Sequence, residues 1–102
     1  MKKRILTEAS GSLVSAYLIK AIKESGNISV ASDVDKNNHG LCLADEFTVL
    51  PYSNDPELWK IIETKLIEYR IDMVIPSFDK TLMGWSKRKE YFKKKGVHVL
   101  VS

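Results

Sequence analysis

Polar side chains that could bind a ligand stand directly after three of the predicted strands. The candidate substrate-binding residues are Glu8, Ser10, Gly11, Ser12, Asp33, Ser77, Phe78 and Asp79. In an open parallel sheet the turn after the first strand is a docking place for ligands, because backbone N–H groups and the dipole of the following helix converge there. We expect these residues to bind a small-molecule substrate, and we assign none of them a catalytic role.

The first of these turns, TEASGSLV at residues 7–14, partly resembles the dinucleotide fingerprint T-G-x-x-G-x-x-G. Only the middle glycine, Gly11, is retained, while Glu8 and Val14 replace the outer two. A carboxylate beside a diphosphate costs about 1 kcal/mol per charge pair in water and more in a cleft. Asp33, about 20 residues further on, does fit the acidic position that holds a ribose. A stand-alone Rossmann-type module that binds a nucleotide or has a regulatory role is therefore the alternative hypothesis.

Metal and nucleophilic chemistry have weaker support. His39 lies in a polar turn, His98 in the last predicted strand and the single Cys42 in an apolar segment, so these residues lack metal-ligand spacing. We interpret Cys42 as a buried, unreactive thiol. The serine turns lack the G-x-S-x-G elbow that would hold a nucleophile in place. The sequence predicts no metal site and no cofactor held by the chain itself.

Five short apolar segments alternate with helical ones, and these elements must position the polar turns. Strands are predicted at residues 4–6, 27–32, 47–50, 71–76 and 97–102. Helices are predicted at residues 14–25, 56–70 and 80–95, with one helical turn at residues 41–44. Gly84 weakens the last helix.

Helix ends are indicated by capping residues. Asp55 and Asp79 are predicted N-caps, and Pro56 is suited to the first helical position. Gly26 and Gly96 are predicted to end their helices, since glycine adopts the left-handed conformation that follows a helix. Every long helix therefore has at least one predicted boundary.

The alternation predicts an α/β fold with three layers and a Rossmann-like, five-stranded parallel sheet. Helical crossovers join parallel strands, and right-handed crossovers order the first three strands as 3-2-1. The fourth strand must then lie beside the first, which gives the order 3-2-1-4-5 with helices on both faces. Because the switch point falls between strands one and four, the loops at residues 7–12 and 76–79 should face each other.

Composition indicates a single globular domain. Of 102 residues, 44% are hydrophobic and 28% charged, and a chain of this size buries roughly two-thirds of its surface. The net charge is +3, and we interpret the basic run at residues 86–95 as a solvated helix face rather than a nucleic-acid surface. No apolar run approaches the ~20 residues of a membrane span, so we expect a cytoplasmic protein without membrane contact. A third hypothesis is an interaction domain that works through an apolar face around Trp85 and the basic helix.

Four consecutive segments resemble the amino-terminal pre-ATP-grasp domain of ATP-grasp ligases. They are KRILTEASGSLVSAYLIKAIKESGN, VASDVDKNNHGLCLADEFTVLPYSNDPE, YRIDMVIPSFDKTLMGW and KKKGVHVLVS. The likeness covers essentially the whole chain, depends on segment order, and extends to proteins like the large subunit of carbamoyl-phosphate synthase. It implies that residues 1–102 form one pre-ATP-grasp domain, the N-terminal part of a longer ligase.

The resemblance also implies a function, that of the substrate-side domain of an ATP-dependent carboxylate–amine ligase. Such enzymes use ATP and Mg²⁺ to activate a carboxylate as an acyl phosphate, and an amine then displaces the phosphate. In the family the nucleotide and metal are held mainly by later domains, so we expect the isolated chain to be inactive. The implied partners are an ATP-grasp domain, in cis or in trans, and a small-molecule substrate, and homo-oligomer formation stays open.

The family pattern maps onto three loops of this chain. These are residues 10–12 after the first strand, Asp33 and Asp35 after the second, and residues 77–79 after the fourth. Glu8 departs from the pattern, since relatives usually have glycine there, and this argues against direct anion binding by the first turn. Glu8 could instead meet an amine substrate, a neighbouring domain or solvent.

Overall fold

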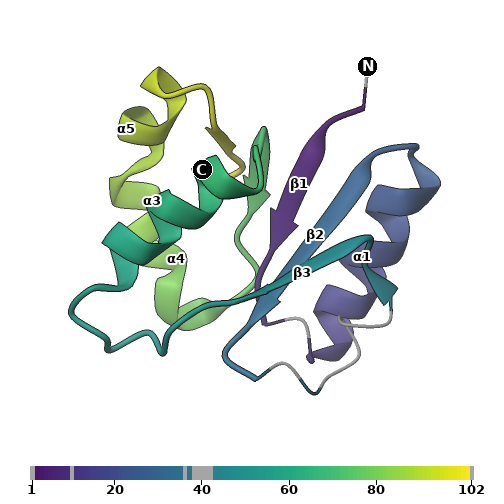
Figure 1. The fold of residues 1–102 in the computed structure, drawn as a ribbon, viewed down its shortest axis with the longest axis horizontal. Helices are drawn as coiled ribbons and strands as arrows, with labels where there is room; N and C mark the ends of the chain where they lie inside the picture. The colour runs from purple at the N-terminus through teal and green to yellow at the C-terminus, as the bar shows by residue number, and fades with distance from the viewer. Residues whose placement is uncertain (1, 10, 36, 38–42, 102) are drawn as a thin grey trace.

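The computed structural model describes residues 2–9, 11–35, 37 and 43–101, which are coloured in Figure 1. The predictions for Ser10, His39 and Cys42, and for the start of the helical turn at residues 41–44, lie outside the described residues. None of the described helices is long and apolar enough to cross a membrane.

Strands and helices alternate along the described chain. The strands are β1 (Arg4–Thr7), β2 (Ile28–Asp33), β3 (Glu46–Val49), β4 (Met73–Ile75) and β5 (His98–Val99). The helices are α1 (Leu13–Glu24), α3 (Leu58–Glu68), α4 (Asp79–Lys87) and α5 (Lys89–Lys94). Each predicted strand is present, although β4 and β5 are shorter than the apolar segments that predicted them.

The strands form one parallel sheet in the order β3-β2-β1-β4-β5, which confirms the predicted order. β1 is central, because Leu6 pairs with Val30 of β2 on one side and with Val74 of β4 on the other. All three side chains are buried, as expected of parallel strands that are covered on both faces. The loops after β1 and β4 therefore leave the sheet next to each other.

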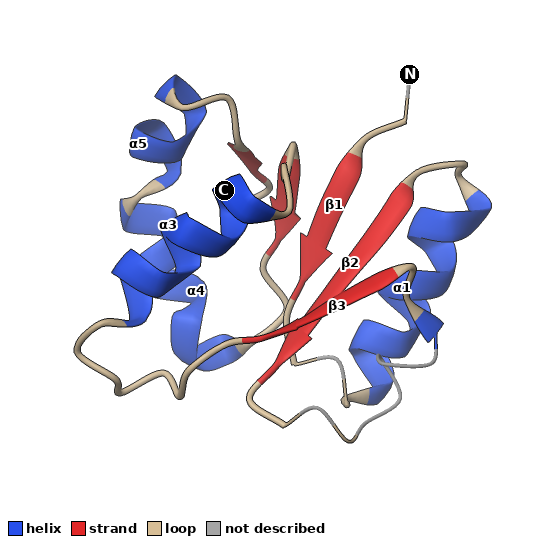
Figure 2. Ribbon diagram, in the orientation of Figure 1, coloured by secondary structure: helices blue, strands red, loops and turns tan. Residues whose placement is uncertain are grey.

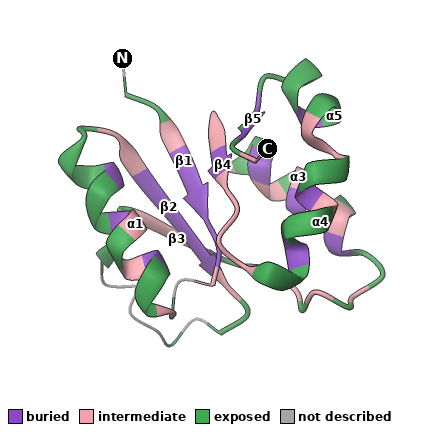
Figure 3. Ribbon diagram, turned by 180° about the vertical axis from the view of Figure 1, so that it is seen from behind, coloured by how far each residue is buried: buried purple, intermediate pink, exposed green. Residues whose placement is uncertain are grey.

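Helices cover both faces of the sheet and complete the three predicted layers. α1 lies on one face, whereas α3, α4 and α5 lie on the other (Figure 1, Figure 2). Buried residues follow the strands and the inward sides of the helices, and exposed residues lie outside (Figure 3). On α3 the buried residues are Leu58, Ile62 and Leu66, whose spacing of four places them on one helix face.

The predicted helix start at Asp55 is wrong by two residues. The Asp55 carboxylate accepts the Glu57 N–H at 2.8 Å, and the Asp55 carbonyl accepts the Leu58 N–H at 3.1 Å. An aspartate that binds the backbone two residues ahead forms a turn that competes with the helix. Pro56 consequently lies in this turn, and α3 begins at Leu58.

The prediction that Asp79 caps the following helix is also wrong. Phe78 occupies the N-cap position with an extended backbone at φ −137°, and it provides no side-chain hydrogen bond to the helix. Asp79 is the first residue of α4, where its negative charge still complements the helix dipole.

The last predicted helix is divided into α4 and α5 at Arg88. The Arg88 guanidinium donates to the Gly84 carbonyl at 3.1 Å. Trp85 and Phe92 are buried on either side of the break, with ring centroids 5.6 Å apart. Trp85 is 0% exposed, so its own ring is not available to a partner, and the hypothesis of an interaction domain stays a prediction.

Candidate functional site

The loops that follow β1 and β4 are joined at the carboxyl edge of the sheet, the lower edge in Figure 1. The Glu8 N–H donates to Ser77 Oγ at 2.8 Å, and the Ser77 hydroxyl donates to the Glu8 carbonyl at 2.9 Å. These residues are 69 positions apart in the sequence, so their contact depends on the adjacency of β1 and β4. The two loops expected to face each other are thus in direct contact.

The side chain of Glu8 lies inside this junction and is only 4% exposed. Its Oε2 accepts the Thr81 hydroxyl at 2.7 Å, and its Oε1 accepts the Ser77 N–H at 3.4 Å. Ser77 lies in the segment that connects β4 to α4, and Thr81 lies in the first turn of α4. The alternative that Glu8 faces solvent is therefore wrong.

Burial raises the pKa of Glu8 above its ordinary value of 4.5, because removal from water penalises the charged carboxylate. The indole N–H of Trp85, the Thr81 hydroxyl and the Ser77 N–H oppose this rise in pKa by favouring the charged form. The Trp85 indole nitrogen is buried and has no partner in hydrogen-bonding geometry among the described residues. Its N–H still favours the charged form of the Glu8 carboxylate. Glu8 thus takes up a proton more readily than an exposed glutamate does.

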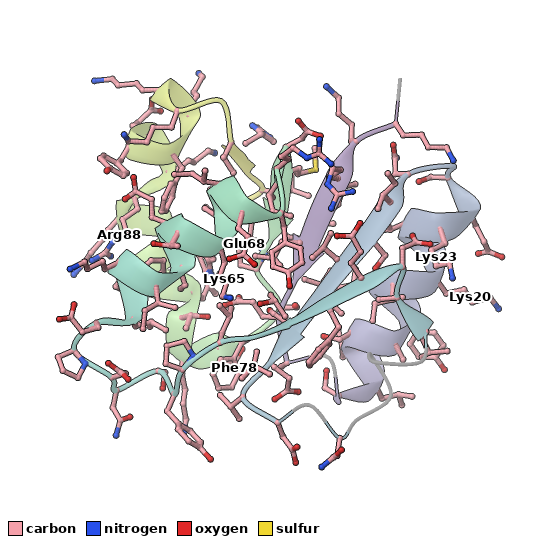
Figure 4. The ribbon with its side chains drawn as sticks, viewed as in Figure 1. Lys20, Lys23, Lys65, Glu68, Phe78 and Arg88 are labelled. Atoms are coloured by element: carbon pink, nitrogen blue, oxygen red, sulfur yellow. The ribbon has the colours of Figure 1, made fainter. Side chains whose placement is uncertain are left out.

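A pocket of about 210 Å³ opens beside Glu8. Its walls are mostly apolar and include Leu50 after β3, Leu58 and Ile62 of α3, and Phe78 before α4. Phe78 is labelled in Figure 4 and lies where the strands end. Among the described lining residues, the titratable groups are the carboxyl groups of Glu8 and Asp33.

A second set of contacts joins the loop after β1 to the end of β2. The Gly11 N–H donates to Asp33 Oδ2 at 2.9 Å, and the Val34 N–H donates to Asp33 Oδ1 at 2.6 Å. Between Glu8 and this contact, Ala9 adopts a left-handed backbone with φ 49°. A residue with a Cβ atom is strained in this conformation, so the turn is made without the glycine that would normally favour it.

Ser12 and Asp79 do not line the pocket. Ser12 is the N-cap of α1, and its hydroxyl oxygen accepts the Ser15 N–H at 3.1 Å. Asp79 lines a different hollow, together with Leu82 and Leu100. Their role in substrate binding stays a prediction, as does that of the other candidate residues.

Sequence analysis missed Thr81, which donates to the buried carboxylate. Thr81 stands four residues before Trp85, and residues at this spacing share one face of a helix. Since the large aromatic ring of Trp85 is expected to face the core, this spacing could have placed Thr81 there too. The apolar wall residues have no such signal, because Leu50 and Ile62 look like any other core positions in the sequence.

The described residues at this edge do not fit a nucleotide. The pocket is smaller than the roughly 300–1,000 Å³ typical of sites for larger ligands. No Lys or Arg is among the described lining residues, and the Glu8 carboxylate would oppose a diphosphate. The described chain also contains no group of three or more His, Cys, Asp or Glu residues that could hold a metal ion. We therefore assign no step in this chain to ATP or Mg²⁺.

The strand order and the pocket beside the β1–β4 switch point define a Rossmann-like α/β domain. Residues 6–100 match the family model described as the PylC-like N-terminal domain, and the chain belongs to this family. Together with the structural matches below, this confirms the resemblance to pre-ATP-grasp domains. No curated protein matches the chain.

Two solved structures share the fold. A complex of biotin carboxylase from Campylobacter jejuni with β,γ-ATP superposes with a TM-score of 0.75 at 19% identity, covering 97% of this chain and 23% of that protein. The biotin carboxylase domain of a single-chain bacterial carboxylase gives a TM-score of 0.71 at 18% identity, covering 96% and 24%. The chain spans about a quarter of the length of these structures, and at such identities the likeness concerns the fold alone.

Proposed function

We propose that this chain is the substrate-side domain of an ATP-dependent carboxylate–amine ligase whose nucleotide is held by an ATP-grasp region. The main observation is the small, apolar, carboxyl-lined pocket where the loops after β1 and β4 meet. Family membership and the fold shared with biotin carboxylases support the proposal. In the parent enzyme a carboxylate would be activated as an acyl phosphate, and an amine would displace the phosphate.

In this proposal the chain binds and orients a substrate. The apolar side chains of Leu50, Leu58 and Phe78 would exclude water from the bound molecule, and this strengthens its polar contacts to Glu8. The Thr81 hydroxyl holds the Glu8 carboxylate in place. A likeness to carbamoyl-phosphate synthase and a cytoplasmic location belong to the same proposal.

The first test is calorimetric titration of the 102-residue chain with ATP, NAD and NADP. We expect no binding tighter than about 1 mM for any of the three, since the pocket suits neither a diphosphate nor an adenine ring. Binding of NAD or NADP with a dissociation constant near 1 μM would contradict the proposal. It would support the stand-alone nucleotide-binding module instead.

The second test measures phosphate release by an ATP-grasp region supplied with and without this chain. We expect phosphate release to require ATP, a carboxylate and an amine, and to depend on the presence of the chain. Equal rates with and without the chain would contradict its role on the substrate side of the site.

A further inference from the structure

We infer that the pocket beside Glu8 binds a primary alkylammonium group on an unbranched aliphatic chain. The inference rests on the proposed function only where it identifies this amine with the nucleophile of a ligase. The binding preference itself follows from the volume, the walls and the charge of the pocket.

The volume and walls of the pocket favour a short aliphatic molecule. A cavity of about 150 Å³ holds one benzene molecule, so 210 Å³ admits about eight non-hydrogen atoms. Leu50, Leu58 and Ile62 form a hydrocarbon wall on the α3 side, and Phe78 adds an aromatic surface. These side chains offer no hydrogen bond, so the part of the ligand that lies against them must be apolar, although Ser32 and Ser53 also line the pocket.

The charge of the pocket is opposite to that of the whole chain. The sequence has 16 Lys and Arg against 13 Asp and Glu, yet the described lining contains the carboxyl groups of Glu8 and Asp33 and no basic side chain. Among the described residues, neither carboxyl group forms an ion pair within 4.0 Å. A cation is therefore complementary to the pocket, whereas an anion would be repelled.

Glu8 retains hydrogen-bonding capacity for such a cation. An ionised carboxylate offers about four acceptor sites; Thr81 and Ser77 fill two of them and the Trp85 indole N–H acts on a third, which leaves about one. The contact to Oε1 is long, at 3.4 Å, so this oxygen is the weaker bound of the two. A primary ammonium group has three N–H donors and would supply the missing hydrogen bond as well as the opposite charge.

Ligand charge and the protonation of Glu8 must then be coupled. An ammonium group near the carboxylate favours its charged form, which opposes the effect of burial. A carboxylate ligand would instead require Glu8 to be protonated, and an uncharged alcohol would respond weakly to its protonation. Asp33 on β2 is the other titratable group on the described lining, and the Ser77, Thr81 and Trp85 groups around Glu8 do not titrate in this range.

The test is a titration of the ¹⁵N-labelled chain with n-pentylamine, 1-pentanol and pentanoate, followed through the backbone amide signals of Glu8, Ala9, Phe78 and Thr81. We expect pentylamine to shift these signals with an affinity about tenfold above that of pentanol, and pentanoate to bind least. The pentylamine affinity should rise as the pH increases above 4.5 and Glu8 ionises. Equal affinities for the three probes, a flat pH profile or no pentylamine binding would overturn the inference.

Two isosteric variants distinguish the contributions of the Glu8 and Asp33 carboxyl groups to pentylamine binding. Glu8→Gln should lower pentylamine affinity about tenfold and abolish its pH dependence, while pentanol affinity changes less than about twofold. Asp33→Asn should change pentylamine affinity by less than about threefold, because its carboxylate already accepts backbone N–H groups. A larger loss from Asp33→Asn than from Glu8→Gln would overturn the assignment. If Glu8→Gln fails to fold, the pH profile of the unaltered chain decides the question.

The two proposals fail in different ways. Pentylamine binding that is intact in a chain unable to support ATP-dependent ligation would refute the proposed function and leave the pocket assignment standing. Intact ligation with no amine bound at the pocket would refute the pocket assignment and leave the proposed function standing.

Discussion

Glu8 makes the free energy of unfolding depend on pH. Burial raises its pKa above the unfolded value of 4.5, so the folded chain binds more protons than the unfolded chain between the two pKa values. This stabilising contribution is fully present below pH 4.5 and is lost as the pH rises through the folded pKa. Glu8→Gln cannot ionise, so we expect its stability relative to the unaltered chain to increase as the pH rises above 4.5 and through the folded pKa of Glu8.

Urea unfolding of both proteins across this pH range measures the effect. Glu8→Ala is the matched comparison, because it removes the carboxylate acceptor of the buried Thr81 hydroxyl and leaves only the longer contact to the Phe78 carbonyl at 3.2 Å. We expect Glu8→Ala to lower the free energy of unfolding by about 1–3 kcal/mol throughout the pH range. Parallel pH profiles for Glu8→Gln and the unaltered chain would show that the Glu8 pKa is not raised in the folded state.

Ala9 is predicted to store backbone strain next to the pocket. Its φ of 49° is unfavourable for a residue with a Cβ atom, so Ala9→Gly should raise the free energy of unfolding by about 0.5–1 kcal/mol. Arg70→Gly, at φ 52° after α3, should give a similar gain. Ala21→Gly in the exposed part of α1 should instead lose about 1 kcal/mol. A lower free energy of unfolding for Ala9→Gly, measured by urea unfolding, would contradict the claim that Ala9 is strained.

The burial of Glu8 could not be predicted from the sequence around it. A glutamate in a turn is usually exposed, and its partners Ser77 and Thr81 are 69 and 73 residues away. The adjacency of their loops could be predicted from the strand order, but the direction of a side chain within that junction could not. The burial of Thr81 could have been predicted, because it stands four residues before Trp85 on the same helix face.

The packing of α4 against α3 depends on the absence of a side chain at Gly84. A Cβ atom there would lie 2.1 Å from Trp59 Cζ2. The Trp59 ring is held by an edge contact with Trp85 at 5.0 Å and by the Arg88 guanidinium at 4.2 Å. We expect Gly84→Ala to lose about 1–3 kcal/mol, although alanine is ordinarily about 1 kcal/mol better than glycine in a helix.

Thermal and urea unfolding of Gly84→Ala measure this loss. The double variant Trp59→Leu/Gly84→Ala is the control, since a smaller side chain on α3 makes room for the new methyl group. The effect of Gly84→Ala should then become neutral or favourable. A Gly84→Ala chain more stable than the unaltered one would contradict the described contact.

Helix ends show which local signals were sufficient. Gly26 and Gly96 both have φ 86° and follow their helices as predicted, because few other residues adopt this conformation. Asp55 was misinterpreted as an N-cap because an aspartate carboxylate accepts a backbone N–H a few residues ahead both in a turn and at the start of a helix. The break at Arg88 has no glycine or proline to mark it; the Arg88 side chain there bonds the Gly84 carbonyl one turn earlier and lies over the Trp59 ring of α3.

The strand order was predictable for the whole domain, since alternating elements and right-handed crossovers leave few arrangements. This strand order implies that backbone amides in different strands are protected from hydrogen exchange to different degrees. Amides of β1 and β2 should exchange with solvent only on global unfolding, whereas β5, with two residues and pairing to β4, should exchange faster. Hydrogen exchange followed by NMR checks this, and faster exchange in β1 than in β5 would contradict the central position of β1.

The proposed substrate pocket requires an enclosed carboxyl group on its wall, and ¹³C NMR titration of the Glu8 carboxyl carbon tests this most directly. We predict an apparent pKa for Glu8 above 4.5 in the folded chain, and a further shift when Thr81→Val removes the hydroxyl that favours its charged form. That further shift should be upward. A Glu8 pKa at or below 4.5 would contradict the account, because the carboxyl group would then be solvated or already paired with a cation.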